Sequence, residues 1–203
     1  MNCIRRATRD DAPEINSLRL AEYSRAKEFT LVEPALLTWN ERDDQDVVLA
    51  AWDERRHAIS TMRGGIARDR RQAEDKLKCT LADDYLFPSL ILDRAATSKD
   101  HRGGGLNSAL RYYFFFSILG LPVFSVLGAV YEHAPRVKTM EELGYRISTL
   151  CLKVQTHVQS DLSLFVTYLE HSKIRDACDR LRVMAQSPIA DYPWCGDPLE
   201  FKL

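Results

Sequence analysis

Three consecutive glycines in the stretch DRAATSKDHRGGGLNSALRYYFFFSILGLP, residues 93–122, constrain the fold more than any other feature of the sequence. The apolar run Leu90, Ile91, Leu92 precedes this stretch, and a long aromatic segment follows the glycines without a break. This order predicts a buried strand, a loop of bare backbone and the start of a helix. Glycine allows positive φ angles and lets a ligand approach the backbone amides closely, because it has no Cβ.

A helix that starts from such a loop is suited to bind an anion. The first backbone N–H groups of a helix have no partner within it, and the helix dipole makes them slightly positive. The glycine spacing matches neither G-x-G-x-x-G nor G-x-x-x-x-G-K-[ST], so it disfavours a dinucleotide and a nucleoside triphosphate. The alternative is a tight turn that only packs the helix against the strand, and the glycines alone do not decide between the two.

The composition indicates an ordinary globular protein. The chain has 203 residues, of which 45% are hydrophobic and 28% charged, so it can bury a core, and we expect a single domain over residues 1–203. The net charge of −1 argues against a nucleic-acid partner. The five cysteines show no metal-ligand spacing, and we see neither a signal-peptide pattern nor an apolar run of membrane-spanning length. We therefore expect a cytoplasmic protein with reduced thiols, no metal ion and no membrane contact.

Helical and strand patterns are mixed along the chain. Before the glycines, the sequence predicts a strand over residues 2–7, a helix capped at Thr8, a helix over 34–41, a hairpin over 46–67, a charged helix over 69–83 and a strand over 87–97. After them, it predicts a helix over 104–119, a strand over 121–130, a helix over 135–144, an antiparallel pair over 145–154 and 162–170, and a last helix over 173–185. We therefore predict a mixed α/β fold.

The segment HRGGGLNSAL resembles the R-x-x-G-x-G/A loop of the GCN5-related N-acetyltransferases, the GNAT superfamily. The order of elements agrees with that family, and MEELGY resembles its L-Y-x-x-x-G-F helix end. The resemblance covers about residues 2–155 and leaves residues 156–203 as a C-terminal extension. It implies a mixed, mostly antiparallel central sheet flanked by helices, followed by a C-terminal helix and tail.

The resemblance also implies an activity, the transfer of an acetyl or longer acyl group from acetyl-CoA or another acyl-CoA to the amine of a small molecule, amino acid or peptide. In that family the loop amides hold the pyrophosphate of coenzyme A, and the strand before the loop borders the donor. The donor-binding residues implied here are Ala95, Ala96, Thr97, Arg102, Gly103, Gly104, Gly105, Leu106 and Asn107. Asn107 departs from the family's glycine or alanine, and Met140 stands where the family often has a tyrosine that protonates the leaving thiolate.

An acyl transfer requires a neutral amine, and therefore a base or a water path to one. Asp93, at the end of the strand beside the loop, is one candidate base. Glu132 and His133, at the end of the next predicted strand, are the others. For each of the three a non-catalytic role is the stronger interpretation, because a carboxylate at a strand end is most often solvated or in an ion pair, and a lone histidine is most often structural.

Two alternatives to a short-chain acetyltransferase stay open. The segments STMRGG and LDRAATSKDHRGGGL resemble the acyl-homoserine-lactone and N-acyl amino acid synthases, which take long acyl chains, often from acyl carrier protein. Arg63, Asp93 and Arg94 agree with their pattern only approximately. The other alternative is a sensor that binds acyl-CoA without turnover, which Asn107 and Met140 favour. The tail DYPWCGDPLEFKL has enough apolar bulk to dock on its own chain or on a second copy, so a homodimer stays open as well.

Overall fold

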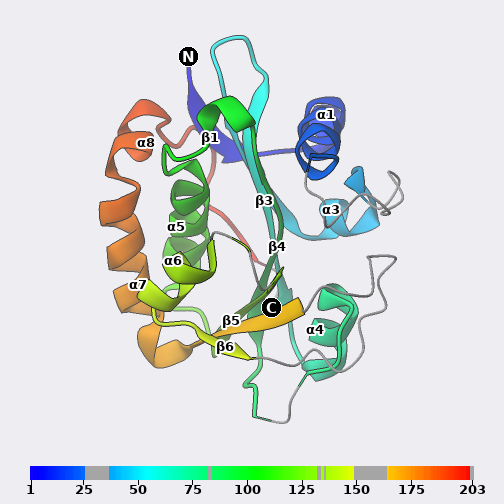
Figure 1. Ribbon diagram of the computed structural model, residues 1–203, viewed down its shortest axis with the longest axis vertical. Helices are drawn as coiled ribbons and strands as arrows, with labels where there is room; N and C mark the ends of the chain where they lie inside the picture. The colour runs from blue at the N-terminus through cyan, green and yellow to red at the C-terminus, as the bar shows by residue number, and fades with distance from the viewer. Residues whose placement is uncertain (26–36, 82–83, 132–133, 135, 149–163, 202–203) are drawn as a thin grey trace.

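A seven-stranded sheet forms the centre of the computed structural model, which describes residues 1–25, 37–81, 84–131, 134, 136–148 and 164–201 (Figure 1). The strand order is β1-β2-β3-β4-β5-β7-β6. The strands are β1 (Cys3–Arg6), β2 (Val47–Trp52), β3 (Ala58–Ala67), β4 (Ser89–Thr97), β5 (Ser125–Tyr131), β6 (Arg146–Ser148) and β7 (Leu164–Glu170). β4 and β5 are parallel, and the other neighbouring strands of this sheet are antiparallel. The predicted mixed, mostly antiparallel sheet is confirmed.

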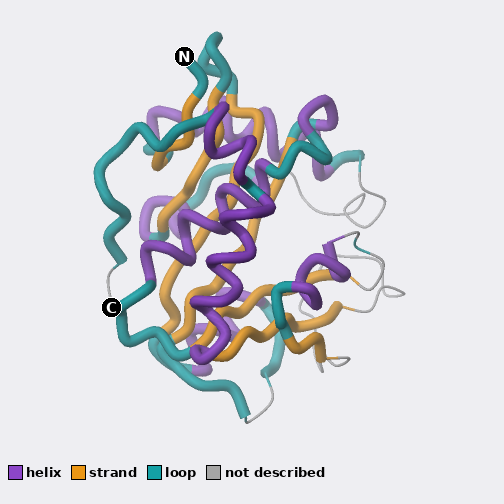
Figure 2. Tube along the Cα trace, turned by 90° about the vertical axis from the view of Figure 1, so that its left-hand side faces the viewer, coloured by secondary structure: helices purple, strands orange, loops and turns teal. Residues whose placement is uncertain are grey.

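Helices cover both faces of the sheet (Figure 1, Figure 2). One face carries α1 (Ala12–Tyr23), α3 (Glu41–Gln45) and α4 (Arg70–Leu77). The other carries α5 (Leu106–Ile118), α6 (Arg136–Glu142), α7 (His171–Met184) and α8 (Gln186–Asp191). Figure 2 shows this second helical layer in front of the strands.

The largest part of the core lies between the sheet and α5. The buried residues of α5 recur at helical spacing, and the aromatic run contributes two of them, Phe114 and Phe115. Phe116, on the opposite side of the helix, is 59% exposed. The aromatic run therefore serves mainly as core, as the sequence predicted.

Two glycines let neighbouring groups approach β3 closely. A Cβ on Gly64 would overlap the ring of Phe114, and a Cβ on Gly65 would overlap the carboxylate of Asp46. Phe114 of α5 therefore packs against β3 at Gly64, and the Asp46 carboxylate packs against β3 at Gly65. Neither glycine has space for a methyl group.

The predicted elements agree with the structure except near the second helix. The backbone N–H of Thr8 donates to Asp11 Oδ2 at 2.8 Å, which is the predicted cap ahead of α1. Residues 34–36 of the predicted second helix lie outside the described residues, Leu37 is helical, and residues 38–40 are not; a separate short helix, α3, begins at Glu41. Asn40 decides this start, because its side chain accepts a hydrogen bond from the backbone N–H of Arg42 at 3.1 Å.

The C-terminal extension also differs slightly from prediction. The predicted antiparallel pair is β6 with β7, and residues 149–163 between them lie outside the described residues. The last predicted helix begins at His171 and is followed by a second, shorter helix, α8. Beyond α8, Trp194 lies opposite Ile4 of β1 in a parallel bridge. The tail therefore docks on its own chain in this structure.

We expect Gly65→Ala to destabilise the protein, because the new methyl group would displace the Asp46 carboxylate from Lys76. Overpacking of this kind costs about 1–3 kcal/mol, which lowers Tm by roughly 2–12 °C in a chain of this size. Gly104→Ala is the matched control, since its Cβ would approach only the His101 carbonyl oxygen, at 3.5 Å. Thermal unfolding measures both variants, and equal Tm values would contradict the role given to Gly65.

Candidate functional site

β4 and β5 separate midway along their length. Their parallel pairing runs from Ser89 opposite Ser125 to Leu92 opposite Gly128. Beyond Leu92, β4 continues to Thr97 in register with β3 alone, while β5 continues in register with β7. The edges that face each other therefore leave backbone groups available to a ligand between them.

The glycine loop follows β4 directly. Gly103 and Gly105 have φ angles of 79° and 80°, and Gly105 is the N-cap residue of α5. The backbone N–H groups of residues 103–108 form no hydrogen bond within the described part of the chain. A Cβ on Gly105 would lie 3.2 Å from the Met184 carbonyl oxygen, so the junction of α7 and α8 supports the loop.

Arg102 joins this loop to α1. Its Nη2 lies 2.5 Å from Oε2 of Glu22, and its Nε donates to the Thr97 carbonyl oxygen at 3.3 Å. The backbone N–H of Lys99 donates to Oε1 of the same Glu22 at 3.3 Å. Because Glu22 lies on the buried face of α1, it fixes the position of the loop relative to that helix.

Asp93, the first residue of β4 beyond its pairing with β5, is held by two arginines. It accepts hydrogen bonds from Arg63 Nε at 2.7 Å and Nη2 at 2.9 Å, and from Arg42 Nη2 at 2.9 Å. Burial alone would raise the pKa of Asp93, but the charge and hydrogen bonds of Arg63, together with the charge of Arg42, outweigh it and lower this pKa. Asp93 is therefore a carboxylate at neutral pH and a weak proton acceptor.

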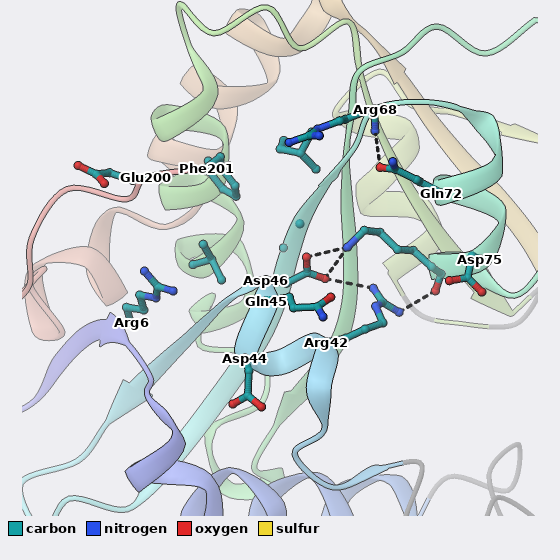
Figure 3. Close-up of a pocket in the computed structure, with 15 residues that line it drawn as sticks. Arg6, Arg42, Asp44, Gln45, Asp46, Arg68, Gln72, Asp75, Glu200 and Phe201 are labelled. Atoms are coloured by element: carbon teal, nitrogen blue, oxygen red, sulfur yellow. Dashed lines mark hydrogen bonds and ion pairs between the residues drawn. The ribbon is translucent and has the colours of Figure 1, made fainter. Parts of the chain in front are cut away.

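The ion pairs continue on both sides of Asp93. On one side, Arg42 Nη2 lies 3.4 Å from Asp46, which also accepts from Lys76 Nζ at 2.6 and 2.8 Å (Figure 3). On the other side, Arg63 lies 3.3 Å from Asp43, and Asp43 accepts from Arg19 Nη2 at 2.8 Å. We call this row the ion-pair chain; in order it comprises Lys76, Asp46, Arg42, Asp93, Arg63, Asp43 and Arg19.

A cavity of about 470 Å³ opens beside Asp46 (Figure 3). It lies where β3 extends past the start of β2, and Figure 3 shows α4 on one side and the tail residues Glu200 and Phe201 on the other. Arg42 lines this cavity and also contacts Asp93. The ion-pair chain therefore connects the cavity with Asp93, in the middle of β4, where this strand leaves β5.

Those predicted site residues that the structure describes lie in one region. Ala95, Ala96 and Thr97 lie on the part of β4 that has left β5, residues 102–105 lie in the loop after it, and Leu106 and Asn107 begin α5. Glu132 and His133 lie outside the described residues. Asp93 stays a prediction as a base, and its lowered pKa favours a positioning role. Met140 is 4% exposed within the main core.

Sequence reasoning missed most of the ion-pair chain. Arg19 was not predicted as part of the site, although it lies with Ile15, Leu18 and Glu22 at helical spacing on the buried face of α1. The signal available in the sequence was the presence of charged residues on this otherwise apolar face. Asp43 and Asp46 lie in a short acidic stretch ahead of β2, and nothing in that stretch distinguishes them from exposed acids.

Two classes of site have no support in the described part of the chain. No group of three or more His, Cys, Asp or Glu residues there is arranged to hold a metal ion. None of the described helices is both long and apolar enough to cross a lipid bilayer.

We expect Asp93→Asn to lower the free energy of unfolding by about 3 kcal/mol at neutral pH, because the buried Arg63 would lose its carboxylate partner. The pKa of Asp93 is lowered on folding, so its ionised form stabilises the fold above about pH 4, and this contribution is lost as the pH falls through the lowered pKa. The difference between wild type and variant should therefore be complete at neutral pH and shrink in acid. Urea unfolding across this pH range measures it.

Asp75→Asn is the matched control for this variant. Asp75 pairs with Lys78 at 2.7 Å, but its side chain is 73% exposed, so the change should stay within about 1 kcal/mol. An Asp93→Asn effect as small as that of the control, or one that does not change with pH, would contradict the structural role of Asp93.

Comparisons with known proteins agree with this geometry at the level of the fold. No family model matches the sequence, and no curated protein matches it significantly. Among solved structures, a CoA-dependent acyl-homoserine lactone synthase, BjaI, with SAM and isopentyl-CoA is 15% identical, with a TM-score of 0.59, and the match covers 99% of this chain and 96% of that one.

Several N-acetyltransferases are similar as well. The ribosomal-protein-S18-alanine N-acetyltransferase from Escherichia coli is 15% identical with a TM-score of 0.54, and the match covers 84% of this chain and 94% of that one. An N-acetyltransferase from Staphylococcus aureus Mu50 is 11% identical with a TM-score of 0.56, with coverage of 84% and 98%. The chain therefore has the GNAT fold that these acetyltransferases and the lactone synthase share.

Proposed function

We propose that this chain is an N-acyltransferase that moves an acyl group from acyl-coenzyme A to an amine. The observation that carries the proposal is the row of backbone N–H groups over residues 103–108, which have no partner in the described chain and open the N-terminus of α5. A pyrophosphate fits such a row, because several N–H donors and the helix dipole together stabilise its two negative charges.

The gap between β4 and β5 supports the same proposal. An extended chain that carries amide groups, such as pantetheine, forms hydrogen bonds with the open edge of a strand. The part of β4 that has left β5 includes Ala95 and Ala96, whose small side chains leave room for such a chain. The acyl group would then lie near Asp93, and Arg63 and Arg42 would hold Asp93 in place.

The departing thiolate requires little help from the protein. A thiol has a pKa of about 8.5, so a thiolate is a good leaving group near neutral pH. Met140 cannot donate a proton, and its burial in the core keeps it from contact with solvent. Tyr145 is buried as well, with its hydroxyl accepting a hydrogen bond from Arg111 Nη1 at 3.3 Å, and burial raises its pKa. In the proposed reaction the amide C–N bond forms as the C–S bond breaks, and the thiolate takes its proton from water or from the attacking nitrogen, which is positively charged until it loses that proton.

We expect Asn107→Asp to weaken coenzyme A binding at least about 10-fold, because it places a negative charge beside the pyrophosphate at the second position of α5. The same charge is favourable for the helix itself, since acidic residues stabilise helix N-termini and the first turn of α5 has none. Affinity should therefore fall while Tm stays level or rises. Calorimetry with coenzyme A and thermal unfolding measure the two effects.

Asn107→Ala is the matched control and should bind coenzyme A as well as the wild type does. Unchanged affinity in the Asp variant would contradict the placement of the pyrophosphate. A thiol-release assay with acetyl-CoA and a mixture of amines then tests turnover, because a sensor binds acyl-CoA but releases no free coenzyme A.

A second candidate is an enzyme of the acyl-homoserine-lactone or N-acyl amino acid synthase type, which would use a longer acyl donor from coenzyme A or acyl carrier protein. The observation that favours it is the share of this chain that each structural match covers. The lactone synthase matches 99% of this chain, including the C-terminal extension, whereas the two N-acetyltransferases match 84%.

Donor length separates the two candidates. If the second is correct, kcat/KM for isopentanoyl-CoA or octanoyl-CoA should exceed that for acetyl-CoA by at least about 10-fold, since each buried methylene contributes roughly 0.8 kcal/mol. A thiol-release assay with one fixed amine mixture measures all three donors. A preference for acetyl-CoA would leave the short-chain N-acetyltransferase as the function.

A further inference from the structure

We propose that Arg94 binds a carboxylate on the acceptor, so that the amine this protein acylates belongs to an amino acid or a similar amino-carboxylate. The inference rests on the proposed N-acyltransferase function and names the chemical class of its acceptor. Three observations on the described residues carry it: the backbone conformation of Arg94, its lack of a carboxylate partner, and its position at the gap between β4 and β5.

The backbone of Arg94 adopts an unfavourable conformation. Its φ angle is +50°, in the left-handed region that side chains other than Gly, Asn and Asp rarely occupy. It lies in the irregular stretch of β4 where the pairing with β3 shifts between Asp93 and Ala96. A strained non-glycine residue in a strand is typical of a functional position, because an arginine has no local advantage there.

Arg94 also lacks a carboxylate partner. Its Nη1 donates to the Thr38 carbonyl oxygen at 2.9 Å, and no ion pair with a carboxylate forms within the described chain. Burial, followed by the nearby charges of Arg63 and Arg19, lowers its pKa to about 10, so it remains a cation at neutral pH. The guanidinium keeps donors that a bound anion can use.

The ion-pair chain does not supply the missing negative charge. It contains four cations and three carboxylates, and Arg94 adds a fifth cation beside it. Arg19 at its end is fully buried, yet its Nε and Nη1 have no hydrogen-bond partner. The buried Arg19 and Arg63 each have a carboxylate partner, whereas the half-buried Arg94 has none within the described chain. Cations removed from water are normally paired, so this excess indicates a place for an anionic ligand.

The position of Arg94 suits an acceptor rather than a donor. It lies two residues beyond Leu92, where β4 leaves β5, and its contact with Thr38 directs it to the region that α1 and α3 border. Next to it, the Tyr23 hydroxyl of α1 donates to the Ala95 carbonyl oxygen at 3.2 Å. The pyrophosphate loop lies at the other end of this segment, after Thr97.

The charges of the region favour a carboxylate over a phosphate. A carboxylate matches the planar fork of one guanidinium and carries a single negative charge. A phosphate carries up to two charges and would meet stronger repulsion from Asp93 and Asp43, which lie near Arg94. A neutral amine would leave the positive charge of Arg94 without a partner.

The test compares matched ligands on the wild type, Arg94→Asn, Arg94→Lys and the control Arg9→Asn. The probes are N-acetyl derivatives of methionine, leucine and phenylalanine as free acids and as carboxamides, and N-acetylated phosphoethanolamine, each titrated calorimetrically with and without coenzyme A. Arg9 is an exposed arginine paired with Asp44, so its replacement removes one positive charge outside the site.

We expect the wild type and Arg9→Asn to bind at least one acid about 10- to 100-fold more tightly than its carboxamide. Arg94→Asn should abolish this preference without weakening coenzyme A and without lowering Tm, because Asn tolerates a positive φ angle better than Arg. Arg94→Lys should retain part of the preference, since it keeps the charge and loses the fork.

Three outcomes would overturn the proposal. They are equal binding of acids and amides across the wild-type panel, an acid preference that survives in Arg94→Asn, and tighter binding of the phosphate probe than of every acid. Titrations without coenzyme A keep this test separate from the proposed function. A wild type that binds the acids but not coenzyme A would refute the acyl-CoA donor and leave the carboxylate site standing.

Discussion

The paired hydrogen bonds between Arg63 and Asp93 hold together the region on which the candidate site depends. They join β3 to β4 at the point where β4 leaves β5, and Arg42 and Asp43 extend the contact to α3. A buried ion pair of this kind adds little net stability compared with well-packed apolar side chains, but its loss leaves an uncompensated charge and is costly. The arrangement therefore acts chiefly to fix geometry, with α1 and α3 held beside the open end of β4.

The proposed donor and acceptor sides of the candidate site rely on different parts of the chain. On the proposed donor side the main chain would supply the groups: the loop amides of residues 103–108 and the open edges of β4 and β5. Such a site tolerates substitution of many side chains, because the backbone supplies its hydrogen bonds. On the proposed acceptor side the groups are side chains from α1, α3 and β4, and Arg94 is the one whose charge the ion-pair chain leaves without a partner among the described residues. Under this proposal, selectivity for an acceptor would depend on a few side chains.

Features that depend on neighbouring residues were predictable. The glycine loop, the start of α5 and the buried aromatic residues follow from local backbone chemistry and helical periodicity, and the structure has them where the sequence placed them. Asn40 shows the limit of this reasoning, because its side chain caps a separate short helix, α3, that the sequence did not predict. Arg19 shows another limit, since a charged residue on an apolar face is anomalous until its partner, Asp43, is known.

The sequence by itself determined the fold class and the position of the loop, and it predicted the residues that would border the proposed donor, because each is encoded over a short span. Only the tertiary structure decided how the charges combine. The members of the ion-pair chain are separated by up to about a third of the chain in sequence, and α1, α3, α4, β3 and β4 meet only after the sheet forms. The physical reason is that an ion pair depends on distance and burial, neither of which the spacing of residues along the chain specifies.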